Sequence, residues 1–283
     1  MTLEDNPLVR LPMPFDATGL FPELRQHLVV LLSNLTQDEW EYTTTCPGWS
    51  VRDVALHLLG VDLGYLSGRR DRYQDPWWQT ASGDTVADLA IFNANWVVAG
   101  RRISPRLLCE LLTITGDAVS RYHATLDLLA LGQSVWWVGP DPAPVWLDIA
   151  REYTERWVHQ QQIREAVGKP GLRDARYLAP VIATFVHALP RALHGAAAPR
   201  GTVVRLLVEG DAGGRWIAVR GQDQWTLAQD DGRMESATVT MDQDTAWRLW
   251  TRGISPDDAR PSLRTDGDPH LVAHVLDMVS IIA

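Results

Sequence analysis

The chain of 283 residues has little cysteine, no excess of positive charge and no long apolar run. Its two cysteines, Cys46 and Cys109, are too few for a disulfide scaffold or a cysteine-rich zinc site, and they suit a reducing compartment. A formal net charge of −9 argues against non-specific binding to nucleic acid or anionic lipid. Since about 18 consecutive apolar residues are nowhere found, we expect no membrane span.

Several sequence signals of targeting and catalysis are also missing. The opening stretch, MTLEDNPLVRLPMPFD, lacks a basic segment followed by an apolar one, so we expect no secretory signal peptide and a cytoplasmic protein. The chain has no glycine-rich phosphate loop and no GxSxG elbow, which argues against nucleotide-binding and serine-hydrolase classes. Neither cysteine has an activating base nearby in sequence, and a structural role is favoured for Cys46. The chain therefore offers no clear nucleophile of its own.

The apolar and charged fractions, 46% and 22%, are ordinary for a globular protein, and the length suggests two domains. Apolar residues recur at three- and four-residue steps through the first two thirds, which indicates amphipathic helices. Ser50 is placed to cap one of them, and Ser104-Pro105 opens another. The helices are predicted at about residues 20–35, 51–65, 85–100, 105–129 and 145–167.

The pattern changes after Gly171. One more helix is predicted at 178–193, followed by the small-residue turn GAAAPRG. Alternating segments then predict strands, a short helix and a closing helix, which together favour an α+β domain. The predicted strands are TVVRLLVEG, RWIAVR, QWTLA, ATVTM and the start of SLRTDGD. We therefore expect a helical domain at 1–172 and an α+β domain at 173–283.

A metal site is the strongest chemical signal. Glu155 and His159 are four residues apart on a predicted helix, so their side chains share one face. His57 stands at the inward edge of another helix and offers a third ligand. Two imidazoles and a carboxylate leave a position open for water or substrate, as catalytic zinc sites do. Glu152, one turn before Glu155, is a competing ligand, and nickel, iron or manganese would also accept these donors.

Four segments, in order, resemble the DinB-like, mycothiol-dependent maleylpyruvate isomerase family, and together they cover nearly the whole chain. They are TTTCPGWSVRDVALHLLGVD, NANWVVAGRRISPRLLCELL, YTERWVHQQQIREAVGKPG, and the C-terminal LWTRGISP with LRTDGDPHLV. The resemblance implies an up-down four-helix bundle followed by a sterol-carrier-like α+β domain. The polar, aromatic stretch 69–84, which contains DPWW, has no counterpart that we can place in the family pattern.

The resemblance also implies a zinc ion whose three ligands match His57, Glu155 and His159, and an external low-molecular-weight thiol. Zinc would stabilise the thiolate near neutral pH. In the family's isomerase the thiolate would add to the double bond of maleylpyruvate, the resulting single bond would rotate, and elimination would leave fumarylpyruvate. Mycothiol is the family's usual thiol, although no residue excludes bacillithiol, glutathione or ergothioneine.

The dianionic substrate needs a cation. The resemblance places a substrate-contacting arginine at Arg252-Gly253, where a guanidinium could bind a carboxylate through two hydrogen bonds. Arg252 could equally be an arginine that complements the negative end of a helix, and Arg220 is a weaker alternative.

Three functions remain open on the sequence: the isomerase, an S-transferase that joins the thiol to an electrophile, and a non-catalytic metal-bearing protein that binds a ligand. A small anionic substrate and a thiol are the expected partners. The oligomeric state cannot be read from the sequence.

Overall fold

The computed structural model describes residues 13, 15–77, 82 and 85–280 and divides the chain into two compact units. Residues 18–126 and 156–171 form a helical unit, and the other described residues form a second unit. The sequence predicted a domain boundary after residue 172, and the chain passes from the helical unit to the second unit after Gly171. Residues 127–155 also belong to the second unit, together with the C-terminal residues. No helix among the described residues is long and apolar enough to cross a membrane.

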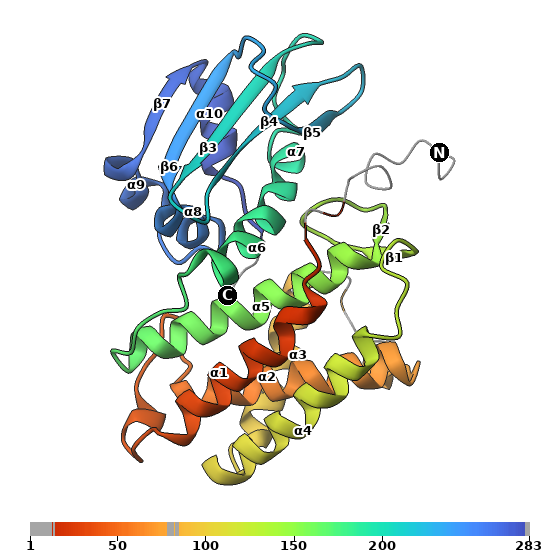
Figure 1. Ribbon diagram of the computed structural model, residues 1–283, viewed down its shortest axis with the longest axis vertical. Coiled ribbons are helices and arrows are strands. Elements are labelled where there is room, and N and C mark those ends of the chain that lie inside the picture. Colours follow the sequence, from red (N-terminus) through yellow and green to blue (C-terminus); the bar gives the residue numbers. More distant parts are fainter. Residues whose placement is uncertain (1–12, 14, 78–81, 83–84, 281–283) are drawn as a thin grey trace. The chain divides into compact units, whose positions relative to one another are not determined.

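Five long helices make up the N-terminal half (Figure 1). They are α1 (Phe21–Ser33), α2 (Val51–Tyr65), α3 (Thr85–Gly100), α4 (Pro105–His123) and α5 (Val145–Ala166). Short turns η3 (Thr18–Leu20), η4 (Glu39–Glu41) and the π-helical η5 (Leu66–Arg70) flank them. One buried apolar cluster takes residues from four of the helices, such as Leu28 on α1, Val54 on α2, Leu112 on α4 and Ile163 on α5. This shared core is that of a four-helix bundle, with α3 packed against α2.

The segment after α4 differs from the prediction. The helix ends at His123 rather than near residue 129, and Asp127 then accepts a hydrogen bond from the Leu129 N–H at 3.0 Å. A side chain that bonds a nearby backbone N–H competes with helix continuation. The following loop, rich in proline and glycine, pairs with itself as strands β1 (Leu131–Ser134) and β2 (Pro142–Pro144), which the sequence did not predict.

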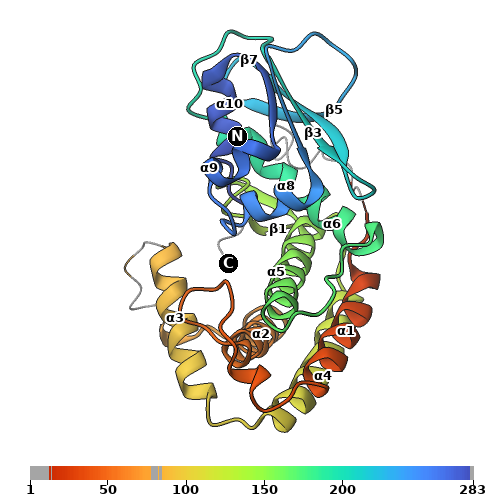
Figure 2. The same cartoon turned by 90° about the vertical axis from the view of Figure 1, so that its left-hand side faces the viewer.

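The C-terminal half begins with helices and continues as a sheet (Figure 2). The predicted helix 178–193 is divided into α6 (Ala175–Phe185), η7 (Val186–Ala188) and α7 (Leu189–Ala192). Pro190 explains the break, because a proline has no N–H with which to continue the helical hydrogen bonds. The later helices are α8 (Gln243–Trp250), α9 (Pro256–Ala259), η8 (Arg260–Ser262) and α10 (Pro269–Leu276).

Five strands form one sheet in the order β5-β4-β3-β6-β7. Their bounds are β3 (Val203–Glu209), β4 (Gly214–Arg220), β5 (Trp225–Gln229), β6 (Ala237–Asp242) and β7 (Arg264–Gly267). Strands β3 and β6 pair in parallel and the other neighbours are antiparallel. Val204, Leu206 and Val208 on β3 are buried, as the alternation predicted. Helices α7, α8 and α10 pack against the strands. The expected fold class, a helical region followed by an α+β domain, is confirmed.

Candidate metal centre

Helix α2 carries His57 in a firmly capped frame. The Ser50 hydroxyl accepts a hydrogen bond from the Asp53 N–H, and the Asp53 carboxylate accepts one from the Ser50 N–H. Arg101 adds two hydrogen bonds to this carboxylate, at 2.9 and 2.8 Å. Burial works to raise the pKa of Asp53, but the hydrogen bonds from Arg101 and Ser50 outweigh burial and lower it. The first turn of α2 is therefore fixed by its own capping box and by Arg101.

His57 lies in the second turn of this helix, and its side chain is 4% exposed. Its neighbours Val54 and Leu58 belong to the apolar core. The ring of Trp49 lies against the imidazole of His57, with 5.1 Å between the ring centroids. The histidine is thus placed at the edge of the core, as its position in the sequence pattern predicted.

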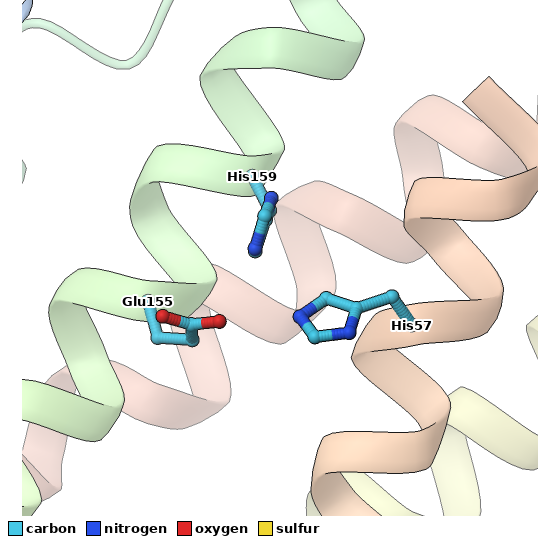
Figure 3. Close-up of side chains that lie close together, drawn as sticks. All are labelled: His57, Glu155 and His159. Carbon is cyan, nitrogen blue, oxygen red and sulfur yellow. The ribbon is translucent and has the colours of Figure 1, made fainter. Parts of the chain in front are cut away.

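Helix α5 supplies the other two groups. Glu155 and His159 are one turn apart on this continuous helix, so both side chains leave it on the same side (Figure 3). His159 is 3% exposed and Glu155 is half-buried. The rings of His57 and His159 meet edge to face at 4.7 Å between centroids. Figure 3 shows the two imidazoles and the carboxylate facing one shared space.

Ligand atoms of the three residues all lie within 4.8 Å of one another. A tetrahedral zinc ion with bonds of about 2.1 Å would separate its ligand atoms by roughly 3.4 Å, so small side-chain rotations would close the site. Two imidazole nitrogens and one carboxylate form a donor set that zinc accepts with a further position left open. The three residues therefore fit a metal ion in a site of the catalytic type, which keeps one coordination position open. The competing ligand Glu152 is not part of the group and instead accepts a hydrogen bond from Arg151.

Two residues beside His159 carry no signal that sequence reasoning recognised. Gln162 Oε1 lies 2.7 Å from His159 Nδ1, and Cys46 Sγ lies 2.9 Å from the same oxygen. Both side chains are buried. Gln162 follows His159 by three residues on one helix, a spacing that places them together, whereas Cys46 comes from the loop before α2.

A second polar network was also missed by sequence reasoning. The fully buried carboxylate of Asp62 on α2 accepts hydrogen bonds from Arg25 on α1 at 2.5 Å, Thr115 on α4 at 2.6 Å and Arg156 on α5 at 2.9 Å. Asp62 thereby ties together all four bundle helices. A Cβ at Gly116 would lie 2.6 Å from Arg25 Nε, so the glycine leaves the space through which Arg25 reaches Asp62.

Arg252 stands just beyond α8, in the left-handed backbone region with φ of 63°. Its side chain is exposed, and its backbone N–H donates a hydrogen bond to the Leu249 carbonyl at 3.2 Å. The position after a helix end is one that glycine usually occupies, because a Cβ is strained there. Arg220, the weaker alternative, is the last residue of β4 and is half-buried. In the 69–84 stretch, the ring of Trp77 contacts that of Phe92 on α3, and Trp78 lies outside the described residues.

Comparison with known proteins places this bundle in a family. The model described as "Mycothiol maleylpyruvate isomerase N-terminal domain" matches residues 21–164, just over half of the chain. The chain belongs to this family, as the sequence resemblance predicted. A search of curated proteins gives no match.

Two solved structures match the fold over 90% of the chain. The crystal structure of the mycothiol-dependent maleylpyruvate isomerase matches with a TM-score of 0.53 and 13% identity, covering 90% of this chain and 93% of that one. A variant of that enzyme with a histidine replaced by alanine matches with a TM-score of 0.51, 14% identity and the same coverage. At such identities the likeness concerns the fold. Sterol carrier protein 2 like 2 from Aedes aegypti matches 35% of this chain and 95% of its own, with 21% identity and a TM-score of 0.27.

Proposed function

We propose that this protein is a metal-dependent isomerase of the maleylpyruvate type that works with a low-molecular-weight thiol, mycothiol being the first candidate. The observation that carries the proposal is the group of His57, Glu155 and His159, whose ligand atoms converge within 4.8 Å. Membership of the mycothiol maleylpyruvate isomerase family supports it. Maleylpyruvate and fumarylpyruvate are the proposed substrate and product.

The histidines and the glutamate would contribute different properties to a zinc site. His57 and His159 would each offer one imidazole nitrogen to the metal, and both side chains are buried. Glu155 brings the one negative charge, so that a divalent ion keeps a net positive charge at its open position and attracts anions. Bound zinc would supply a Lewis acid that stabilises a thiolate at neutral pH.

Metal content is the direct test of the site. Elemental analysis of the wild type should find about one zinc per chain, and His57→Ala, Glu155→Ala and His159→Ala should each lose it. His27→Ala, which removes a histidine of α1 outside the group, should keep the metal. A folded wild type that stays free of metal after zinc loading would contradict the site, and a non-catalytic role would then be the better proposal.

The reaction is tested by following maleylpyruvate and free thiol together. The isomerase returns the thiol, so its concentration should stay constant while product accumulates. Loss of thiol in step with product would instead identify an S-transferase on the same scaffold. Mycothiol, bacillithiol, glutathione and ergothioneine should each be supplied, because the described residues do not select among them.

We also propose that Arg252 binds a carboxylate of the substrate. Its exposed guanidinium and its left-handed backbone support this, since strain of about 1 kcal/mol is retained where glycine would relieve it. Arg252→Gly should therefore stabilise the fold by about 1 kcal/mol and lower kcat/KM roughly 10- to 100-fold. Arg72→Gly is a matched control, because Arg72 is also an arginine with positive φ, and the variant should gain stability without losing activity. Full activity of Arg252→Gly would remove this residue from the substrate site.

A further inference from the structure

Gln162 and His159 form a buried pair on one face of α5. Their side chains are 5% and 3% exposed, and 2.7 Å separates Gln162 Oε1 from His159 Nδ1. This distance is that of a strong hydrogen bond. A neutral imidazole has one N–H donor and one acceptor nitrogen, so a carbonyl oxygen at Nδ1 requires the hydrogen on that nitrogen. The lone pair must then be on Nε2.

The position of Cys46, the second neighbour of Gln162 Oε1, agrees with a hydrogen on His159 Nδ1. Cys46 Sγ lies 2.9 Å from Gln162 Oε1 and 3.8 Å from His159 Nδ1. A thiol donates its hydrogen better than it accepts one, and a carbonyl oxygen has two lone pairs. Gln162 Oε1 can therefore accept both hydrogens, one from the Cys46 thiol and one from His159 Nδ1. An amide turned by 180° would present its NH₂ group to the imidazole and the thiol, and His159 would then carry its hydrogen on Nε2.

Figure 3 shows the consequence for the site. One ring nitrogen of His159 points into the space shared with Glu155 and His57, and the other lies on the side of its own helix. Because Nδ1 lies against Gln162, Nε2 is the nitrogen that faces the space shared with Glu155 and His57. Cys46 lies on the Nδ1 side, which explains why the sulfur is not part of the ligand group.

We propose that Gln162 is a positioning residue that holds His159 in the tautomer and ring orientation a metal requires. As far as the metal is concerned, this inference rests on the proposed function; the tautomer is a property of the metal-free chain. Partners of this kind at the second nitrogen of a ligating histidine change metal affinity by about 10- to 100-fold. The partner here is a neutral amide, which orients the ring without adding a second negative charge.

The tautomer is measured first, on the metal-free full-length protein labelled with ¹⁵N. Long-range ¹H–¹⁵N spectra distinguish the two nitrogens of His159, whose signals are assigned by their loss in His159→Ala. We expect hydrogen on Nδ1 in the wild type and a mixture or reversal of tautomers in Gln162→Leu. Hydrogen on Nε2 in the wild type would overturn the proposal, whether or not the protein binds a metal.

Metal affinity is measured next, by competition with a zinc chelator. Gln162→Leu should bind zinc about 10- to 100-fold more weakly, and Gln162→Glu, which keeps an acceptor at the same place, should bind at least as tightly as the wild type. Gln161→Leu is the matched control, since Gln161 is an equally buried glutamine whose amide bonds the Trp157 carbonyl of its own helix, and its affinity should not change.

Unchanged affinity in a folded Gln162→Leu would overturn the positioning role. Should Gln162→Leu fail to fold, the wild-type tautomer and the retained affinity of Gln162→Glu still decide the question. A wild type without zinc binding contradicts the proposed function, and the tautomer measurement then judges the Gln162 inference separately.

Discussion

The bundle and the C-terminal α+β region bury polar side chains of different kinds. In the bundle most of them are ionisable groups and amides, such as Asp62, Arg156, His159 and Gln162, and Asp62 bonds across helices. In the α+β region they are mostly hydroxyls. Thr184, for example, donates to the Pro180 carbonyl of its own helix at 2.7 Å. A hydroxyl can be satisfied by the nearest turn, whereas a buried charge needs partners brought from elsewhere in the fold.

This difference shows in which region of the molecule charged groups are buried in place of apolar side chains. A buried charge contributes little to stability even when it is paired, because its desolvation offsets the gain from its partners. Proteins keep such groups where orientation or reactivity requires them. The bundle, which carries the candidate metal centre, has them on α1, α2 and α5. The sheet core of Val204, Leu206 and Val208 is apolar, which suits a region held together by packing.

The largest effect that would test this comparison is expected at Asp62. Asp62→Asn keeps the shape of the side chain but leaves Arg25 and Arg156 without their buried counter-charge, which should cost about 3–5 kcal/mol. Burial already lowers the pKa of Arg25, and Asp62 opposes that effect. Thr184→Val is the matched change in the α+β region and should cost about 1 kcal/mol. Urea denaturation measures both; similar losses in the two variants would break the comparison.

The second effect concerns His187, an ionisable exception in the α+β region. Burial lowers its pKa from 6.5 to about 4, and its ring lies 5.5 Å from that of Trp146. The unfolded chain takes up a proton near pH 6.5, whereas the folded chain does so only near pH 4. The free energy of unfolding should therefore fall as the pH drops through this window, by roughly 2 kcal/mol between pH 6.5 and pH 5.

His187→Gln removes this titration and serves as its control. Urea denaturation at pH 7.5 and pH 5 should show a smaller loss of stability in the variant than in the wild type. Equal losses in both proteins would mean that His187 is solvated more than its burial implies.

The smallest effect compares two helix caps of the same design. Ser50 begins α2 and Ser255 begins the four-residue α9, each with a capping box. Ser50→Ala should cost about 1 kcal/mol, the usual value for an N-cap in a long packed helix. Ser255→Ala should cost less than half as much, because its helix has only four residues and buries one of them, Ala259. Thermal unfolding of the two variants measures the difference, and a larger loss for Ser255→Ala would count against this reasoning.

The elements that the sequence predicted best have local signals. Helix α3 occupies the predicted residues 85–100, and α5 ends within one residue of its predicted bound. Strands β3 to β6 coincide with the alternating segments. The end of α4 and the break after Phe185 were predicted less well, because a single aspartate and a single proline decided them against a continuing apolar pattern.

The candidate site also has parts that the sequence predicted and parts that it did not. The spacing of Glu155 and His159 is a property of one helix, so the sequence contained it. That His57 would face them was inferred from its place at the inward edge of another helix and from the family resemblance, and the fold brings the three together. Their role as metal ligands stays a prediction, as does the role of Arg252. Sequence reasoning could not find Asp62 or Cys46 as partners, because their contacts join residues many turns apart.

The sequence by itself determined the order of the long helices and of strands β3 to β6, the change from helical to alternating patterns after Gly171, and the spacing of the two candidate ligands on α5. These depend on neighbours along the chain, where periodicity and capping act over a few residues. Only the tertiary structure decided which nitrogen of His159 lies against Gln162, which cations surround Asp62 and that Arg252 takes a left-handed backbone after α8. Hydrogen bonds and desolvation depend on distances in space, and segments as remote as Cys46 and Gln162 meet only once the helices have packed.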